Sequence, residues 1–227
     1  MIEDYRYERK FKVFGVLGRD LEQMVKVIPG MFREVYQRRH VNNIYLDTDG
    51  MKSYIDNVEG LLERTKYRIR WYGNLMGRIA SPTLEAKHKK DLLGRKKHFK
   101  LEGFLFDNRF TIETLRSVFR NSDLSLAVLA CLANLKPTLV NRYSRKYFLS
   151  DDKKLRITVD SDLSYYKISN YSNNFTVKYD DKNTIVELKY DAVNDQCPDL
   201  VSNCFPFTLS KFSKYVNGIN YVSRVRA

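Results

Sequence analysis

Charged residues occupy every second position in five strand-like segments of this sequence, and this period limits the folds open to the chain. The segment KYRIRWYG places Arg68 and Arg70 two residues apart, with Ile69 between them and Trp71 after them. Successive side chains of a β-strand point to opposite faces, so the two arginines share one face and the apolar residues share the other. Such a strand has a charged face and an apolar face.

The same period recurs in the segments RYERK, LEAKHK, KLRITVD and VELKYD. Their polar faces carry Arg6, Glu8 and Lys10; Glu85, Lys87 and Lys89; Arg156, Thr158 and Asp160; and Glu187, Lys189 and Asp191. In any one strand, the simpler interpretation is an ordinary charged face turned to water. Five strands that repeat Arg or Lys, with an isolated Glu two residues away, favour a barrel whose charged faces line the interior. The apolar faces would then pack outward against helices.

The rest of the chain supplies enough strands to close such a barrel. About eight segments read as strands, with turn signals between several of them: Tyr5–Gly15, Glu34–Asp47, Thr65–Gly73, Pro82–Lys90, Lys96–Phe106, Lys136–Leu149, Lys154–Asp162 and Thr184–Asp191. Helices are predicted at Asp20–Ile28, with Asp20 as the N-cap, and at Asp49–Val58, Thr111–Phe119, Ser122–Leu135 and Thr208–Val222.

The predicted fold class is therefore α+β, mainly antiparallel β. We expect an eight-stranded closed β-barrel tunnel with surrounding helices. The sequence has no internal repeat and no linker-like stretch, so residues 1–227 are predicted to form a single domain. This domain would carry a helical insertion at about 111–135 and a C-terminal helix at about 208–222.

Composition narrows the classes of ligand and compartment. Lysine and arginine outnumber aspartate and glutamate by 40 to 27, and the resulting net charge of +13 attracts polyanions such as nucleic acid, anionic membranes or polyphosphate. The N-terminal segment MIEDYRYERKF lacks the apolar core of a signal peptide, and no apolar run is long enough to span a bilayer. The three cysteines, Cys131, Cys197 and Cys204, have the spacing of neither a disulfide framework nor a zinc site. We expect a cytoplasmic protein with reduced, mostly buried thiols and no membrane segment of its own.

A barrel interior lined with cations requires a counter-charge, because desolvated like charges repel one another. The planar fork of arginine suits phosphate oxygens, and lysine adds point charges along a phosphate chain. Glutamates between these cations would weaken anion binding unless they held a divalent cation, and Mg²⁺ and Mn²⁺ prefer carboxylate oxygens. The pattern therefore predicts a metal–triphosphate site inside the barrel.

Eight ordered motifs carry a resemblance to a known family: YRYERKF, NNIYLDT, KYRIRWYG, LEAKHK, NRYSRKYF, LRITVD, VELKY and SKFSKYVNG. Together they resemble the VTC domain, the polyphosphate polymerase domain of the vacuolar transporter chaperone complex. That domain belongs to the triphosphate tunnel metalloenzyme (CYTH-like) superfamily. The resemblance implies an eight-stranded antiparallel tunnel in which basic residues hold a triphosphate or polyphosphate chain and a glutamate-bound Mn²⁺ or Mg²⁺ assists. It also implies transfer of the γ-phosphate of ATP to polyphosphate.

Carried over position by position, the resemblance implies a set of site residues. The phosphate-binding candidates are Lys10, Arg68, Arg70, Lys87, Arg145, Arg156 and Lys189, together with Lys211 and Lys214 from the C-terminal helix at a tunnel mouth. Glu187 is the main metal-ligand candidate, and Glu8 and Glu85 are secondary ones. Arg6 stands where the superfamily's first-strand E-x-E-x-K element has its first glutamate, and it joins Lys100 as a secondary phosphate-binding candidate. Arg142 and Lys146 would lie on the opposite strand face from Arg145 and are left out.

The sequence leaves the outcome of the chemistry open. If water is the acceptor, the same site makes a tripolyphosphatase or nucleoside triphosphatase. A non-catalytic polyphosphate or nucleotide sensor is the third alternative. Nucleic-acid binding is disfavoured, because it predicts basic clusters with exposed aromatic residues and no phased glutamates. The expected partners are ATP and polyphosphate or triphosphate, and a membrane partner on a separate chain is compatible with the sequence.

Overall fold

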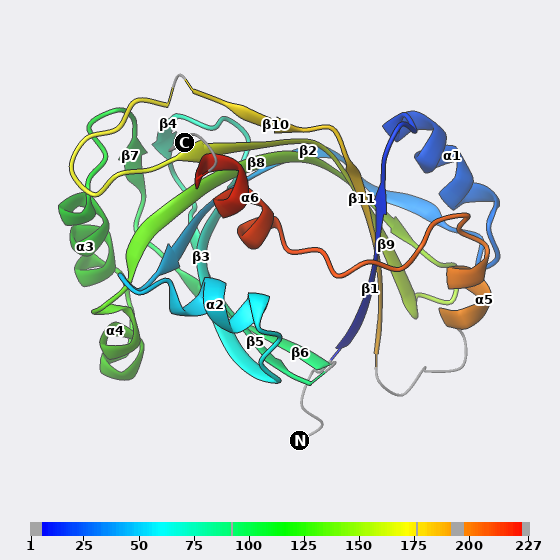
Figure 1. The fold of residues 1–227 in the computed structure, drawn as a ribbon, viewed down its shortest axis with the longest axis horizontal. Helices are drawn as coiled ribbons and strands as arrows, with labels where there is room; N and C mark the ends of the chain where they lie inside the picture. Colours follow the sequence, from blue (N-terminus) through cyan, green and yellow to red (C-terminus); the bar gives the residue numbers. More distant parts are fainter. Residues whose placement is uncertain (1–5, 92, 176, 192–197, 224–227) are drawn as a thin grey trace.

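The computed structural model describes residues 6–91, 93–175, 177–191 and 198–223 (Figure 1). The strands are β1 (Arg6–Val13), β2 (Arg33–Asp47), β3 (Glu63–Tyr72), β4 (Gly77–Ile79), β5 (Thr83–Lys90), β6 (Leu93–Lys100), β7 (Phe104–Phe106), β8 (Lys136–Leu149), β9 (Leu155–Lys167), β10 (Tyr179–Asp181) and β11 (Thr184–Asp191). The helices are α1 (Gly18–Val27), α2 (Lys52–Val58), α3 (Ile112–Asn121), α4 (Leu126–Leu132), α5 (Pro198–Asn203) and α6 (Lys214–Ser223). A mostly antiparallel sheet with a few helices confirms the α+β class.

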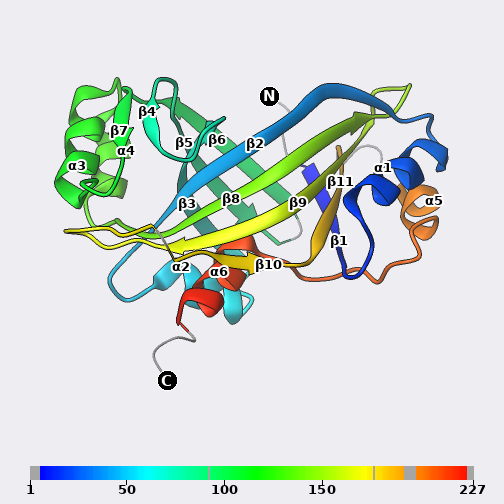
Figure 2. The same ribbon diagram turned by 90° about the horizontal axis from the view of Figure 1, so that it is seen from above.

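One curved sheet contains the long strands. Its order is β10-β9-β11-β1-β6-β5-β3-β2-β8, and β8 also pairs with β9. Figure 2 shows β2, β8 and β9 crossing the molecule side by side. The pairing of β1 with β6 is short, since the described residues give it one register pair, Arg6 with Gly94. The closed barrel therefore stays a prediction at this border.

The outer face of the sheet is apolar and is covered at two places. At one side, Ile69 and Trp71 of β3 are buried in a cluster that includes Phe104 and Phe106 of β7 and residues of α3. At the other side, the outer residues of β1, β9 and β11 pack against α1 and α5, as Figure 1 shows. This confirms that Ile69 and Trp71 face outward beneath covering elements, and it leaves the charged positions of β3 on the inner face.

Helices α3 and α4 lie between β7 and β8, in the segment for which two helices were predicted. Each begins at a residue whose side chain caps it: Thr111 accepts a hydrogen bond from the Thr114 amide, and Ser125 accepts one from the Val128 amide. Such caps satisfy backbone donors that the first helical turn leaves open. Helix α1 differs from expectation, because Leu17 is its N-cap and Asp20 lies in its first turn.

The predicted strand Lys96–Phe106 is two strands in the structure. Strand β6 ends at Lys100, and β7 pairs with β4 in a separate two-stranded sheet. The break lies at Gly103, where a Cβ atom would come within 2.9 Å of the Ile79 carbonyl oxygen. The chain turns there because only a glycine permits this close approach of two backbones.

The C-terminal helix begins later than predicted. Helix α6 starts at Lys214, and the preceding residues run alongside β1 in an extended conformation. The Ser210 amide donates to the Lys10 carbonyl oxygen at 2.8 Å, and the Ser210 hydroxyl accepts from the Lys12 amide at 3.0 Å. These backbone groups are bonded to β1, so the segment from 208 to 213 is not helical. The sequence pattern around Lys211 and Lys214 did not reveal this pairing.

The cysteine prediction was partly wrong. Cys131 and Cys204 are free thiols, but both are exposed rather than buried. Cys197 lies outside the described residues, as does Tyr5, the predicted first residue of the first strand. No helix in the described ranges has the length and apolar character needed to cross a membrane.

Candidate functional site

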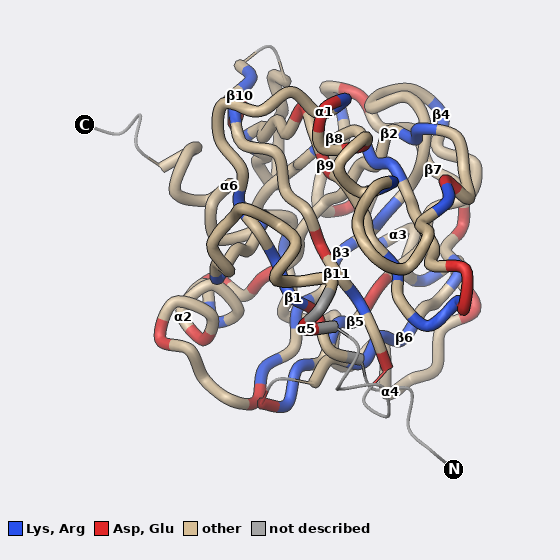
Figure 3. Tube along the Cα trace, turned by 90° about the vertical axis from the view of Figure 1, so that its right-hand side faces the viewer, with Lys and Arg blue, Asp and Glu red and all other residues tan. Residues whose placement is uncertain are grey.

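The inner face of the sheet gathers charged side chains from most of its strands. Strand register explains this: Arg68 pairs with Glu85, Lys66 with Lys87, and Lys10 with Glu187, so charged positions of neighbouring strands lie side by side. Figure 3 shows lysine and arginine positions along β1, β3, β5 and β6, with acidic positions between them. The cations on this face are Lys10, Lys66, Arg68, Arg70, Lys87, Lys89, Lys96, Arg145, Lys189 and Lys214, and the carboxylates are Glu8, Glu85, Asp160 and Glu187.

Arg68 and Arg70 both reach Glu85 on the neighbouring strand. Arg68 donates to one carboxylate oxygen at 2.8 and 2.5 Å, and Arg70 lies 3.2 Å from the other oxygen. Arg70 also donates to Asn43 at 2.9 Å and to the Tyr143 hydroxyl at 3.1 Å. Burial alone would lower the pKa of Arg68, but the Glu85 charge outweighs it and raises that pKa. The two arginines are therefore held in place by Glu85, and Arg68 stays charged.

A second group of ion pairs centres on two buried carboxylates, Asp160 and Glu187. Arg145 donates to both oxygens of Asp160 at 2.5 and 2.6 Å and to Glu187 at 3.3 Å. Lys214, the first residue of α6, lies 2.6 Å from Asp160 and 3.3 Å from Glu187. Burial would raise the pKa of Glu187, but Lys189, Lys214 and Arg145 hold it well below its usual range. The Glu187 carboxylate therefore stays ionised although it is buried.

Glu8 links β1 to β5 and to the same group. Its carboxylate lies 2.7 Å from Lys87 and 3.5 Å from Lys10, and Lys10 lies 3.9 Å from Glu187. Burial would raise the pKa of Glu8, but the charges of Lys10 and Lys87 lower it well below its usual value. Lys10 therefore stands between two carboxylates that come from neighbouring strands.

Lys66 and Lys96 are partly buried inner-face lysines that have no carboxylate within ion-pair distance among the described residues, and Lys89 is another. Lys66 donates to the Ser213 hydroxyl at 3.0 Å, and burial together with Lys10 and Lys87 lowers its pKa to about 7. Burial, Lys189 and Arg68 lower the pKa of Lys96 well below its ordinary value. The Lys66 ammonium group lies among cations without a carboxylate within ion-pair distance, and the charge of Glu85 only partly offsets burial and the cations around Lys96.

The structure brings most, but not all, of the predicted residues together. Lys10, Arg68, Arg70, Lys87, Arg145, Lys189, Lys214, Glu8, Glu85 and Glu187 share the inner face and its ion pairs. Lys100, Arg156 and Lys211 are exposed and make no ion pair in the part of the chain that the structure describes. Arg6 occupies the β1 position opposite Asp191. Lys146 pairs with Glu34 on the outer face, as predicted.

Sequence reasoning did not select four residues that the geometry adds: Lys66, Lys96, Tyr143 and Asp160. Three of them follow from the period of two, because Lys66 precedes Arg68, Tyr143 precedes Arg145, and Asp160 follows Arg156 on the same face. Lys96 could not be selected, because the break after β6 hid the phase of that strand. Tyr143 is 1% exposed, and its ring lies between the Arg145 and Lys214 cations at 5.2 and 4.8 Å.

The donor set on this face fits a divalent cation that is shared with phosphate. The described residues contain no cluster of three or more His, Cys, Asp or Glu arranged to hold a metal ion by itself. Mg²⁺ and Mn²⁺ are commonly held by one or two carboxylates, with water and substrate phosphate completing the shell. Glu187 and Glu8 supply two such carboxylates on neighbouring strands. The Thr158 hydroxyl, directly opposite Glu187, is buried and has no hydrogen-bond partner among the described residues.

Family comparison decides how this chain is classified. A family model described as the VTC domain matches residues 9–223, which run from within β1 to the end of α6. The chain belongs to the VTC domain family. The resemblance inferred from the ordered motifs is thereby confirmed. No curated protein matches the chain at the level required for a reliable relationship.

Solved structures show the same fold in proteins of distant sequence. A candidate adenylate cyclase from Vibrio parahaemolyticus is 12% identical over 99% of both chains, with a TM-score of 0.54. A candidate adenylyl cyclase from Hippeastrum, described as having a dominant triphosphatase activity, is 11% identical over 93% of both chains, with a TM-score of 0.52. A hypothetical protein from Pyrococcus furiosus is 12% identical over 93% of this VTC domain and 99% of its own chain, with a TM-score of 0.52.

Proposed function

We propose that this VTC domain is a metal-dependent phosphotransferase that makes inorganic polyphosphate from ATP. The observation that supports the proposal best is the excess of cations over carboxylates on the inner face of a chain that belongs to the VTC family. Phosphoryl transfer depends mainly on positioning and on stabilising charge, and such a surface can supply both. We also propose that residues 1–227 form one domain and that its eight long strands close into a tunnel.

The proposed roles follow from the geometry. Arg68, Arg70 and Lys87 bind phosphate oxygens, since their donors already face carboxylate oxygens that have similar acceptor geometry. Glu187 and Glu8 would hold Mn²⁺ or Mg²⁺, which would neutralise charge on the phosphates when bound. Arg145 orients the Glu187 carboxylate from β8.

Hydrolysis at the same site is the second candidate. The triphosphatase activity described for the Hippeastrum relative supports it, since that protein shares the fold. A sensor without turnover is the third. The three functions differ in the acceptor: a polyphosphate end, water, or none.

Product analysis distinguishes these candidates. The protein is incubated with ATP and Mn²⁺, and the products are separated on a polyacrylamide gel beside a nucleotide assay. Long polyphosphate together with ADP is the expected result. Free phosphate without polyphosphate would replace the proposal with the hydrolase, and bound but unchanged ATP would replace it with the sensor.

Two substitutions test the assigned roles. Glu187→Gln should lower metal-dependent turnover about 100-fold while tripolyphosphate still binds, because the metal ligand is lost and the cations around it remain. Arg68→Met should weaken both binding and turnover. Glu34→Gln is the matched control, because Glu34 pairs with Lys146 on the outer face. If Glu187→Gln retained metal-dependent activity, the proposed metal site would be wrong.

A further inference from the structure

Three tyrosines surround an arginine where the inner face ends beyond Arg70 and Arg145. The Arg39 guanidinium lies 4.4 Å from the ring centre of Tyr36, 5.7 Å from that of Tyr72 and 5.9 Å from that of Tyr147. The rings of Tyr36 and Tyr147 meet edge to face at 5.5 Å. We call these four residues the tyrosine cluster.

The tyrosine cluster continues the phosphate-binding face along the same strands. The inner positions of β3 run Lys66, Arg68, Arg70 and Tyr72 in order. On β8, Tyr147 follows Arg145 on the same face, and Arg39 of β2 is paired directly with Arg145. One end of this face is thus lysine-rich and the other is aromatic.

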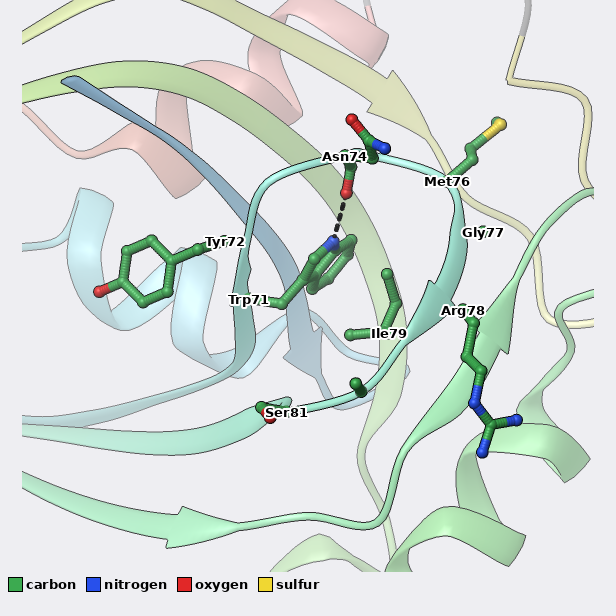
Figure 4. Close-up of a pocket in the computed structure, with 9 residues that line it drawn as sticks. Trp71, Tyr72, Asn74, Met76, Gly77, Arg78, Ile79 and Ser81 are labelled. Carbon is green, nitrogen blue, oxygen red and sulfur yellow. Dashed lines mark hydrogen bonds between the residues drawn. The ribbon is translucent and has the colours of Figure 1, made fainter. Parts of the chain in front are cut away.

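Tyr72 points into this face and not into the apolar layer outside the sheet. Figure 4 shows Tyr72 and Trp71 pointing away from each other, with Trp71 bonded to the Asn74 carbonyl oxygen beneath the loop that follows β3. Trp71 is 2% exposed, whereas Tyr72 is 52% exposed and Tyr36 is 51% exposed. The rings of the tyrosine cluster therefore keep surface open to a ligand, which a purely structural cluster would bury.

We propose that the tyrosine cluster is a nucleobase-binding subsite, which takes the base of a nucleoside triphosphate whose phosphates lie on the arginines of the inner face. This inference rests on the proposed function and names the end of the site at which the nucleoside lies. It also assigns specificity, since the subsite favours a nucleoside triphosphate over inorganic tripolyphosphate.

The chemistry and the spacing fit such a ligand. Tyrosine rings and an arginine plane are surfaces on which any base can stack. Tyr72 lies two positions after Arg70, about 7 Å along the strand, which leaves room for a ribose between base and phosphates. With the base at the aromatic end, the γ-phosphate points along β3 toward Lys66. The acceptor would then enter from the lysine-rich end.

Binding of two ligands that differ in the nucleoside tests the inference. Titration calorimetry with Mg²⁺ compares ATP with inorganic tripolyphosphate for the wild-type chain and for Tyr72→Leu and Tyr147→Leu. Each substitution should weaken ATP binding about tenfold and change tripolyphosphate binding less than about twofold. Tyr72→Phe, which keeps the ring, should bind ATP like the wild type. Tyr171→Leu is the matched control, because Tyr171 is 81% exposed and lies in the segment between β9 and β10.

The outcomes separate this inference from the proposed function. Equal losses for both ligands, or no loss for ATP, would overturn the subsite even if the protein makes polyphosphate. Selective loss of ATP binding supports the subsite even if the bound ATP is never turned over. An absence of ATP binding to the wild-type chain would overturn both. Circular dichroism melts show whether each variant is folded. If the leucine variants are not, the wild-type chain carries the test, because ATP binding no tighter than tripolyphosphate binding would overturn the subsite.

Discussion

The inner face holds two kinds of cation that differ in what balances their charge. Arg145 and Arg68 each have a carboxylate oxygen 2.5 Å away, and these contacts raise the pKa of both side chains against the effect of burial. Lys66 and Lys96 have no such partner among the described residues, and burial beside other cations lowers the pKa of both. Among these four residues, the direction of the pKa shift follows the presence or absence of a close carboxylate. Lys87 is intermediate, because burial and Lys10 lower its pKa to about 8 although Glu8 lies 2.7 Å away.

This difference separates cations whose charge is balanced within the fold from cations whose charge would be balanced by a bound anion. A buried ion pair is internally neutral, and removing one partner exposes the other to an apolar interior. An uncompensated lysine can lose its proton instead, and it regains full charge when an anion arrives. We therefore expect the paired arginines to support the fold as well as to bind phosphate, and the unpaired lysines to regain their charge when phosphate binds.

The largest effect should come from breaking a pair. Arg145→Met removes the guanidinium that Asp160 and Glu187 share, and Asp160 is 0% exposed. The free energy of unfolding should fall by about 3 kcal/mol, because Asp160 is left with Lys214 alone among its two ion-pair partners. Urea denaturation at pH 7 without ligand measures this.

The neighbouring residue supplies the control for that experiment. Lys146 lies on the outer face of β8 and pairs with Glu34 and Glu22 at 2.6 and 3.8 Å. Lys146→Met should cost about 0.5 kcal/mol, as for other pairs near the surface. Equal losses for the two variants would remove the distinction between the inner pair and the outer one.

A smaller effect of opposite sign is expected for an unpaired lysine. Lys66→Met replaces a poorly compensated ammonium group with an apolar side chain, and it should raise the free energy of unfolding by about 1 kcal/mol. The same change should weaken tripolyphosphate binding about tenfold, since one charge-assisted hydrogen bond is lost. Urea denaturation and titration calorimetry measure the two effects. A variant that is less stable, or that binds tripolyphosphate as the wild type does, contradicts the assignment.

The alternation of side chains explains why the main sheet could be predicted. Arg68 and Arg70 lie on the inner face of the sheet, and Ile69 and Trp71 are buried in the apolar layer on its outer face. This arrangement follows from the period of two that is visible in the sequence. The start of α6 could not be read this way. The residues before Lys214 pair with β1, which lies about 200 positions earlier in the chain, and local spacing carries no trace of that contact.

In the candidate site, too, the pattern within one strand could be predicted from the sequence, whereas contacts between strands could not. The resemblance to the VTC domain pointed to Lys87 and Glu187, and the charge repeat of their strands predicted that both face inward. The pairing of Arg145 with Asp160 needed the register of β8 against β9, which includes an irregularity between Arg142 and Ser144. The pattern within one strand does not determine such a register. The sequence therefore predicted that cations face inward, but it did not predict which of them pair with a carboxylate on a neighbouring strand.

The last effect is an exchange of protons at Lys66. Its pKa is about 7 in the folded chain, lowered by burial and then by Lys10 and Lys87, against 10.5 for an ordinary lysine. Between these two values the unfolded chain binds more protons, so this group makes the free energy of unfolding rise with pH from about 7 to about 10.5. Below about pH 7 it is protonated in both states, and this dependence disappears.

Bound phosphate should reverse that shift. At pH 8 the free side chain is roughly one-tenth protonated, and a phosphate beside it restores the charge, so binding takes up about one proton. Calorimetry of tripolyphosphate binding in Tris and in HEPES, which differ in ionisation enthalpy, measures the uptake. Protons exchanged by the ligand itself are common to wild type and Lys66→Met, so the difference between the two chains isolates Lys66. Lys96, whose pKa lies well below its ordinary value, and Lys87, whose pKa burial and Lys10 lower to about 8 despite Glu8, should account for the uptake that remains in the variant. If the two chains took up equal numbers of protons, Lys66 would belong with the paired cations, and the division of the inner face into two groups would fail at this residue.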